Sequence, residues 1–144
     1  MSKGMYGAGK LALGGGNVDL VNSSVSALLV DLSHYSPDLI NDVSLADIPE
    51  DSILADAVLD GKTLTQVVVG GDPFAVFRAD NTTFNSVPDE GKVGTAIVIF
   101  LDANTYSEST LLIFWDDAPQ FPVTPDGTDI TIEWDTGDDG IYRF

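Results

Sequence analysis

The sequence predicts a mainly β protein: a single-domain antiparallel β-sandwich or flattened barrel with a Gly-rich N-terminal arm. Two apolar runs, residues 93–101 and 110–115, are rich in β-branched and aromatic residues and contain no charge. The polar residues 102–109 separate them. Because Val and Ile lose little freedom when extended, two such runs around a polar connection indicate a β-hairpin. We expect this hairpin to lie at the centre of a sheet that is covered on both faces.

Length and composition are those of one ordinary globular domain. The chain has 144 residues, of which 44% are hydrophobic, and it contains no cysteine. A disulfide framework and a thiolate metal site are therefore excluded. No apolar run approaches the roughly 20 residues that cross a bilayer, and the N-terminal segment lacks the apolar core of a signal peptide. We expect no membrane partner and no encoded secretion signal.

Charge is the most unusual feature of the composition. The chain carries 23 acidic and 6 basic residues, a formal net charge of −17. Such a surface repels nucleic acid phosphates, and the basic residues are too scattered along the chain to form a local patch. We therefore expect no nucleic acid partner. Solubility through self-repulsion is the simplest explanation of the acidity, and adaptation to a salty medium or metal binding are the alternatives.

The N-terminal part divides into an arm and the start of the sandwich. Residues 1–16 hold six of the fourteen glycines, and each Gly inside a helix weakens it by about 1 kcal/mol. We expect a flexible or partly helical arm over residues 1–16, with the β-sandwich domain over 17–144. Residues 24–32 then predict a strand, which ends before Pro37 because proline cannot donate to a ladder.

The middle of the chain predicts a short helical turn and further strands. Asp42 is the expected cap of a turn that ends before Pro49. Residues 53–59 and 62–69 predict a hairpin joined by Asp60 and Gly61, a two-residue turn signal. Two glycines and a proline then precede strands at 74–79 and 82–84.

The C-terminal part ends in an alternating strand. Residues 128–134 place Ile130, Ile132 and Trp134 on one face. Residues 135–140 turn the chain, and residues 141–144 predict a last short strand. Eight to ten short strands with little helix indicate the sandwich or barrel architecture.

No catalytic residue and no cofactor site are predicted. His34, the one histidine, follows a strand end, and a Ser-His-Asp device needs an oriented base with a nucleophile beside it. Ser33 and Ser36 flank His34, but neighbours along a strand point to opposite faces. The Gly-rich segments lack the strand-to-helix context of a phosphate loop. We therefore expect a loop histidine and a non-enzymatic protein.

The sharpest local pattern is Asp135-Thr-Gly-Asp-Asp-Gly140. Calcium prefers six to eight hard oxygens from a flexible turn, so Asp135, Asp138 and Asp139 are weak candidate metal ligands. The glutamate and flanking helices of an EF-hand are missing. We expect an acidic hairpin turn without metal, with a Ca²⁺ site as the alternative.

The order of several motifs resembles a family of small virion structural proteins of tailed bacteriophages. The motifs are Gly-Asn-Val-Asp-Leu at 16–20, Val-Ser-Ala-Leu-Leu-Val-Asp at 25–31, Tyr-Ser-Pro at 35–37, Phe-Arg-Ala-Asp-Asn-Thr-Thr-Phe at 77–84, the two apolar runs within 93–115, Ile-Glu-Trp-Asp at 132–135 and Gly-Ile at 140–141. Together they cover nearly the whole chain. The Gly-rich opening and the long 135–140 segment depart from the family pattern.

This resemblance implies a non-enzymatic role in a phage particle. The expected function is that of a capsid decoration, or cement, protein that binds the outside of the head and stabilises it. The implied partners are the major capsid protein and copies of the chain itself, as a homotrimer, after assembly in the host cytoplasm. A DNA-filled head interior would penalise a charge of −17, which favours the exterior. A tail or neck component is the alternative, followed by a carbohydrate- or Ca²⁺-binding β-sandwich module.

Overall fold

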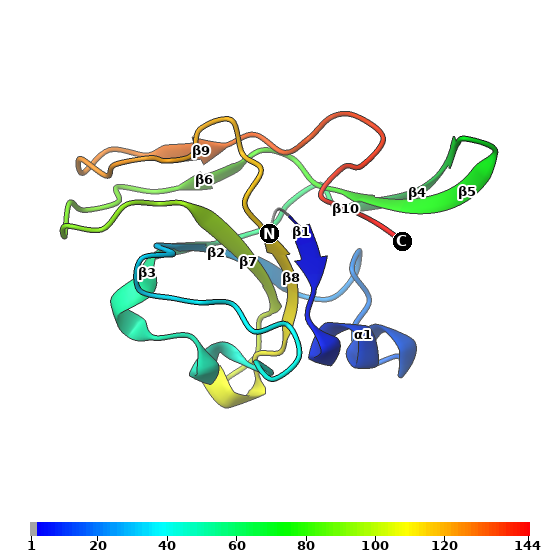
Figure 1. Cartoon of the computed structure of the whole chain (residues 1–144), viewed down its shortest axis with the longest axis horizontal. Coiled ribbons are helices and arrows are strands. Elements are labelled where there is room, and N and C mark those ends of the chain that lie inside the picture. The colour runs from blue at the N-terminus through cyan, green and yellow to red at the C-terminus, as the bar shows by residue number, and fades with distance from the viewer. Residues whose placement is uncertain (1–2) are drawn as a thin grey trace.

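Antiparallel strands dominate the computed structural model, which describes residues 3–144 (Figure 1). The five-stranded sheet has the order β1 (Lys3–Met5), β8 (Leu111–Trp115), β7 (Ala96–Leu101), β2 (Val25–Val30) and β3 (Ile53–Val58). A three-stranded sheet has the order β10 (Tyr142–Arg143), β5 (Asp72–Arg78) and β4 (Thr63–Val69), and β6 (Thr82–Phe84) pairs with β9 (Ile130–Ile132). The helical elements are α1 (Gly7–Gly14) and the 3₁₀ turns η1 (Leu45–Asp47), η2 (Glu50–Ser52) and η3 (Tyr106–Glu108). The predicted mainly β, antiparallel sandwich is confirmed.

The three central strands of the five-stranded sheet are buried on both faces. All residues of β2 and β8 are buried, as are all of β7 except the partly exposed Leu101. The predicted hairpin at the centre of the sheet is confirmed, because β7 and β8 pair antiparallel with Val98 opposite Phe114. A register shift between Ile99 and Phe100 makes Leu112 an extra residue on β8, and such a bulge bends the strand locally.

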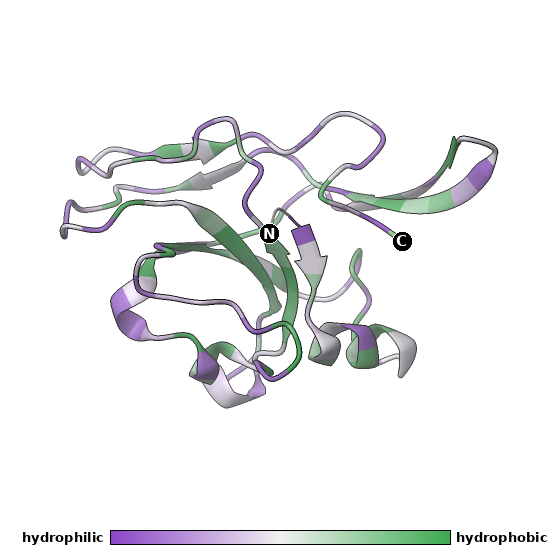
Figure 2. Cartoon of the chain, in the orientation of Figure 1, coloured by the Kyte–Doolittle hydropathy of each residue, from purple (hydrophilic) through white to green (hydrophobic). Residues whose placement is uncertain are grey.

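Two hydrophobic cores lie on the two faces of this sheet. The first core joins the sheet to the β6–β9 pair and to β5, through side chains that include Phe77, Phe84 and Ile132. The second core lies under residues 31–52 and contains Tyr35 and Leu45. Figure 1 shows β6 and β9 across from β7, with the segment that carries η1 and η2 on the opposite side. Because both faces of β7 and β8 are covered, successive residues of these strands are hydrophobic and do not alternate with polar ones (Figure 2).

The alternation predicted for the last long strand is confirmed. Ile130, Ile132 and Trp134 are all buried in the first core, at 7%, 0% and 5% exposure. The residues between them, Thr131 and Glu133, are exposed. Strand β9 therefore covers the central sheet with one face and meets solvent with the other.

The hairpin predicted around Asp60 and Gly61 is wrong. Strand β3 pairs with β2 in the five-stranded sheet, whereas β4 pairs with β5 in the three-stranded sheet. The Asp-Gly turn therefore carries the chain from one sheet to the other. The hairpin turn lies instead at Gly70 and Gly71, with φ of 60° and 86°. Two consecutive residues at positive φ suit a tight hairpin, and glycine adopts them without steric cost.

The cap predicted at Asp42 is also wrong, because Ser44 is the N-cap of η1. The Asp47 carboxylate accepts hydrogen bonds from the backbone N–H groups of Val43 at 2.8 Å and Ser44 at 3.1 Å. These two hydrogen bonds hold the pKa of Asp47 below its usual range. The Asp42 carboxylate instead accepts a hydrogen bond from the Tyr35 hydroxyl at 2.8 Å.

The N-terminal segment packs on the edge of the central sheet. The predicted arm covers residues 1–16, and the structure has a helix, α1, within it together with a strand, β1, that the sequence did not predict. Strand β1 pairs with β8, and Met5 and Tyr6 are buried. Gly9 lets α1 approach β8 closely, because a Cβ there would lie 2.8 Å from the Leu112 Cα. The described part of the arm is therefore continuous with the sandwich.

Asp31 fastens the end of β2 to the start of β7. Its buried carboxylate accepts hydrogen bonds from the Ser33 N–H at 2.8 Å, the Ser33 hydroxyl at 2.7 Å and the Val93 N–H at 3.0 Å. Burial opposes ionisation, but these hydrogen bonds outweigh it and hold the pKa of Asp31 below its usual range. The charged form is therefore the one that the fold stabilises.

We predict that Asp31→Asn lowers the free energy of unfolding at pH 7 by about 1–3 kcal/mol, because the amide nitrogen of asparagine would face the backbone N–H of Ser33 or Val93. The folded pKa is depressed, so this stabilisation is present above the unfolded value of about 3.9 and is lost as the pH falls through the folded value. Urea unfolding at pH 7 measures the loss of stability in the variant, and urea unfolding near pH 2 shows whether the difference from the wild type disappears. The exposed Asp56→Asn is the matched control, and an equal loss in both variants at pH 7 would contradict the prediction.

Candidate functional site

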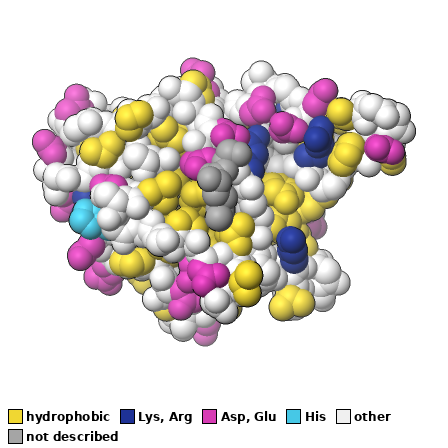
Figure 3. All heavy atoms as spheres, in the orientation of Figure 1, with side chains coloured by type: hydrophobic (Ala, Val, Ile, Leu, Met, Phe, Trp, Pro, Cys, Tyr) yellow, Lys and Arg dark blue, Asp and Glu magenta, His cyan; other side chains and the backbone are white. Residues whose placement is uncertain are grey.

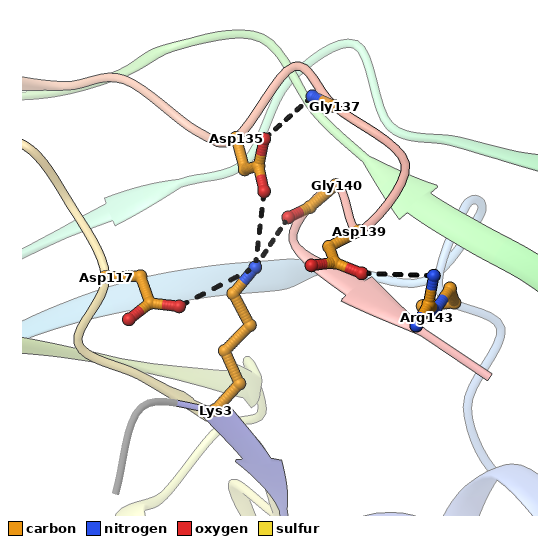
Figure 4. Close-up of polar contacts among 7 residues, drawn as sticks. All are labelled: Lys3, Asp117, Asp135, Gly137, Asp139, Gly140 and Arg143. Carbon is orange, nitrogen blue, oxygen red and sulfur yellow. Dashed lines mark hydrogen bonds and ion pairs between the residues drawn. The ribbon is translucent and has the colours of Figure 1, made fainter. Parts of the chain in front are cut away.

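The acidic segment 135–140 lies beside the N-terminal strand β1, where Lys3 approaches the segment that precedes β10 (Figure 4). Lys3 of β1 points its ammonium group into this segment. The Lys3 Nζ donates a hydrogen bond to the Gly140 carbonyl at 3.2 Å and lies 3.7 Å from the Asp135 carboxylate. On its other side it lies 3.9 Å from the Asp117 carboxylate. One cation therefore joins the first strand to the segments that follow β8 and β9.

The position of Lys3 follows from the pairing of β1. Lys3 lies opposite Trp115 in the β1–β8 ladder, and its Nζ is 5.7 Å from the centre of the Trp115 ring. An indole face attracts a cation at this distance. The Lys3 side chain is only 16% exposed, so its ion pairs are screened less than those of a fully exposed lysine.

The far end of the acidic segment is fixed by close backbone packing. Gly140 has φ of 55°, and a Cβ there would lie 2.7 Å from the Phe77 carbonyl. The next residue, Ile141, donates its N–H to that carbonyl at 2.8 Å. Asp139 pairs with Arg143 at 3.3 Å, and the Arg143 guanidinium lies 4.4 Å from the Phe74 ring centre.

The three candidate metal ligands are not gathered around one point. Asp135 faces Lys3 and accepts the Gly137 N–H at 2.7 Å, whereas Asp139 faces Arg143. Asp138 is exposed. Within residues 3–144 no group of three or more His, Cys, Asp or Glu side chains is arranged to hold a metal ion. Two of the three carboxylates instead neutralise basic side chains.

An open cleft of about 520 Å³ adjoins this corner. Its lining residues are Asn81, Asp117, Pro119, Glu133, Trp134, Asp135 and Thr136. The buried Trp134 forms part of the wall and donates its indole N–H to the Asp80 carbonyl at 3.0 Å and the Thr82 hydroxyl at 3.1 Å. That donor is therefore engaged within the fold, and the cleft presents three carboxylates to solvent together with the polar side chains of Asn81 and Thr136.

His34 is exposed in the turn that follows β2, as expected for a loop histidine. The neighbouring Ser33 hydroxyl donates to the Asp31 carboxylate at 2.7 Å. A hydrogen-bonded chain of two tyrosines and an aspartate lies in the second core, and the sequence did not indicate it. There the Tyr6 hydroxyl lies 2.8 Å from the Tyr35 hydroxyl, which donates to Asp42 at 2.8 Å. Burial raises the pKa of both tyrosines, so both phenols stay protonated and tie the β1–α1 junction to residues 35–42.

The β4–β5 hairpin is the part of the molecule that reaches furthest from the sandwich (Figure 1). Leu64 and Val68 on β4 are 47% and 62% exposed. A mainly apolar groove of about 520 Å³ lies at the base of the hairpin. It is lined by Leu13, Gly16, Val18, Asp19, Leu20, Leu64, Ala75 and Phe144. Figure 3 shows one face of the molecule, on which acidic side chains are spread widely and hydrophobic side chains gather mainly near the centre.

Comparison with known proteins does not add a family to these observations. No protein-family model matches the chain, and a search of curated proteins found no match. Among the described residues, no helix has both the length and the apolar character needed to cross a membrane.

We predict that Lys3→Met lowers the free energy of unfolding by about 1–2 kcal/mol, because it removes a hydrogen bond and leaves Asp117 and Asp135 facing each other without a cation. The loss should shrink as salt is added, since salt screens the remaining repulsion. Thermal and urea unfolding at low and high salt measure both effects.

Lys10→Met is the matched control, because Lys10 is exposed on α1 and the change in net charge is the same. Equal effects of the two substitutions would contradict a specific role for Lys3. A wild-type melting temperature that falls in EDTA and recovers with Ca²⁺ would show instead that the carboxylates act as metal ligands.

Proposed function

We propose that this chain is a non-enzymatic structural protein of a tailed bacteriophage particle and that it decorates the outside of the head. In this role it binds the major capsid protein and copies of itself, and it stabilises the shell. A tail or neck component is the alternative within the same class.

The observation that carries the proposed function is the position of the family-like motif residues in the fold. Leu20 and Tyr35 are buried at 3% and 4% exposure. Asp31 fastens β2 to β7, and Trp134 closes the first core and bonds to the segment before β6. Residues at such positions determine how the sandwich is built. The resemblance therefore rests on residues that are buried in the fold, and this supports the proposal.

The distribution of charge supports an exterior position. Four of the six basic side chains are engaged within the molecule: Lys3 and Arg143 with carboxylates, and Lys62 and Lys92 with the carbonyls of Ser23 and Ile53. These contacts leave the net charge of −17 unchanged, and they show that most of the few basic side chains are already engaged within the molecule. An acidic surface is repelled by packed DNA inside a head, and it carries no such penalty outside.

A carbohydrate- or Ca²⁺-binding module is the second candidate function, and one observation favours it. The cleft beside Lys3 presents Asp117, Glu133 and Asp135 around an open volume. Carboxylates accept hydrogen bonds from sugar hydroxyls and coordinate hard cations. The Lys3 ammonium competes for two of these three groups, so we rank this candidate below the virion protein.

We predict that the purified chain co-sediments with empty heads of the phage that encodes it, when those heads are prepared without the protein. It should not co-sediment with tails. Decorated heads should release their contents at a higher temperature than bare heads, because a ligand that binds only the intact shell stabilises it. His34→Ala is the matched control and should bind as the wild type does.

Binding to tails and not to heads would assign the chain to the tail or neck. Binding to neither particle, together with saturable binding of an oligosaccharide or Ca²⁺, would favour the module.

A further inference from the structure

Most exposed strand edges in this molecule are protected against pairing with another chain. Natural proteins protect edges with short strands, charges and bulges. Strand β1 has three residues and carries Lys3, and β10 has two and carries Arg143. Strands β6 and β9 have three residues each. Strand β3 is longer, but it carries Asp56 and a register shift against β2.

Strand β4 has none of these protections. It is the last strand of its sheet and runs for seven residues, Thr63–Val69, without a charge or a proline. Its pairing with β5 is continuous over all seven positions. Four consecutive residues, 63–66, are exposed, and so is Val68. An uncharged, regular and projecting edge of this length is a template for a further strand.

The backbone groups that point outward from β4 can be identified from its neighbours. On the far side of β5, Ala75 exchanges both backbone hydrogen bonds with Phe144, and Phe77 accepts from Ile141. Residues of an antiparallel strand direct their N–H and C=O to alternate sides. Gln66 and Leu64, which lie opposite Ala75 and Phe77, therefore direct theirs away from β5, and Val68 follows by the same alternation.

These three outward-facing residues are symmetric about Gln66. If a second β4 is placed antiparallel with Gln66 opposite Gln66, then Leu64 lies opposite Val68 and Val68 opposite Leu64. Each outward-facing residue then exchanges both of its backbone hydrogen bonds with its opposite residue. The two copies are related by a two-fold axis, as in most homodimers. Leu64 of each copy then lies opposite Val68 of the other, so that two apolar pairs lie on one face, one on each side of the Gln66 pair.

We propose that β4 is a homodimerisation edge, through which two copies join their three-stranded sheets into one continuous sheet centred on Gln66. Electrostatics favours this edge over other surfaces, because two chains of net charge −17 repel wherever acidic groups meet. Seven residues per copy form less than a standard interface of about 800 Å² per partner, so the dimer dissociates on dilution.

This dimer does not depend on the proposed function, and it differs from the homotrimer that the family resemblance implies. A trimer requires two different patches that meet head to tail, whereas the β4 edge meets itself. Mass measurement therefore separates the two arrangements. At high protein concentration the β4 contact gives twice the chain mass of 15.3 kDa.

Cysteine substitution tests the register directly, because the natural chain has no cysteine. In the dimer, Gln66→Cys places the two thiols opposite each other, with Cα atoms about 5.5 Å apart, within the range of a disulfide. Val68→Cys is the matched control on the same face and edge. Its two copies are offset by four residues, or about 13 Å, and are too far apart to bond. Under mild oxidation we expect covalent dimer to form about tenfold faster or more with Gln66→Cys than with Val68→Cys.

Gln66→Pro tests the backbone bonds. It removes an outward-facing N–H and leaves the bonds between β4 and β5 in place, since proline is tolerated on an edge. We expect a folded monomer by light scattering and near-UV circular dichroism, whereas Gln66→Ala should remain a dimer. Equal crosslinking of the two cysteine variants, a monomeric wild type at high concentration, or a trimer would each overturn the proposal. If a separate protein that pairs with β4 displaced the second copy and the dimer dissociated, the edge would serve that partner instead.

Discussion

Burial of the central sheet on both faces is the constraint on which the rest of this structure depends. Strands β2, β7 and β8 are apolar at nearly every position, so neither of their faces can be left in water. One cover is made by β5, β6 and β9, and the other by residues 31–52 together with Tyr6. These covers come from segments distant in sequence, which explains why so much of the chain is connection rather than strand.

The two covers also determine which polar groups are used inside the fold. Asp31 anchors the start of one cover, and the hydrogen-bonded chain Tyr6–Tyr35–Asp42 connects that cover to the N-terminal segment. Lys3 holds the acidic segment at the end of the other cover. Basic side chains are scarce, and most of them serve this internal role. The surface is left acidic, and the uncharged β4 edge is the exception.

The sequence predicted the elements whose signals lie within a few residues. It did not predict strand pairs or ion pairs between residues that are far apart in the chain. The β7–β8 hairpin and the alternation at Ile130, Ile132 and Trp134 were predictable because strand pattern and turn chemistry lie within a few residues. Asp60-Gly61 and Gly70-Gly71 are both good turn signals, but turn chemistry does not say which strands pair, and only the second closes a hairpin. Asp135 and Asp139 looked like possible ligands because Lys3, the partner of Asp135, lies at the opposite end of the chain. The cap at Ser44 did have a local signal, because Ser44 and Asp47 have the spacing of a capping box.

Native-state hydrogen exchange of the central strands tests the role of the two covers most directly. The Val98 and Ile99 amides of β7 should exchange only by global unfolding. Leu45→Ala, in one cover, and Ile132→Ala, in the other, should each lower the opening free energy of these amides by about 2–4 kcal/mol, because each leaves a cavity against the sheet. If Leu45→Ala weakened protection only within residues 31–52 and left Val98 and Ile99 unchanged, that cover would be a separate unit and the account of the core would be contradicted.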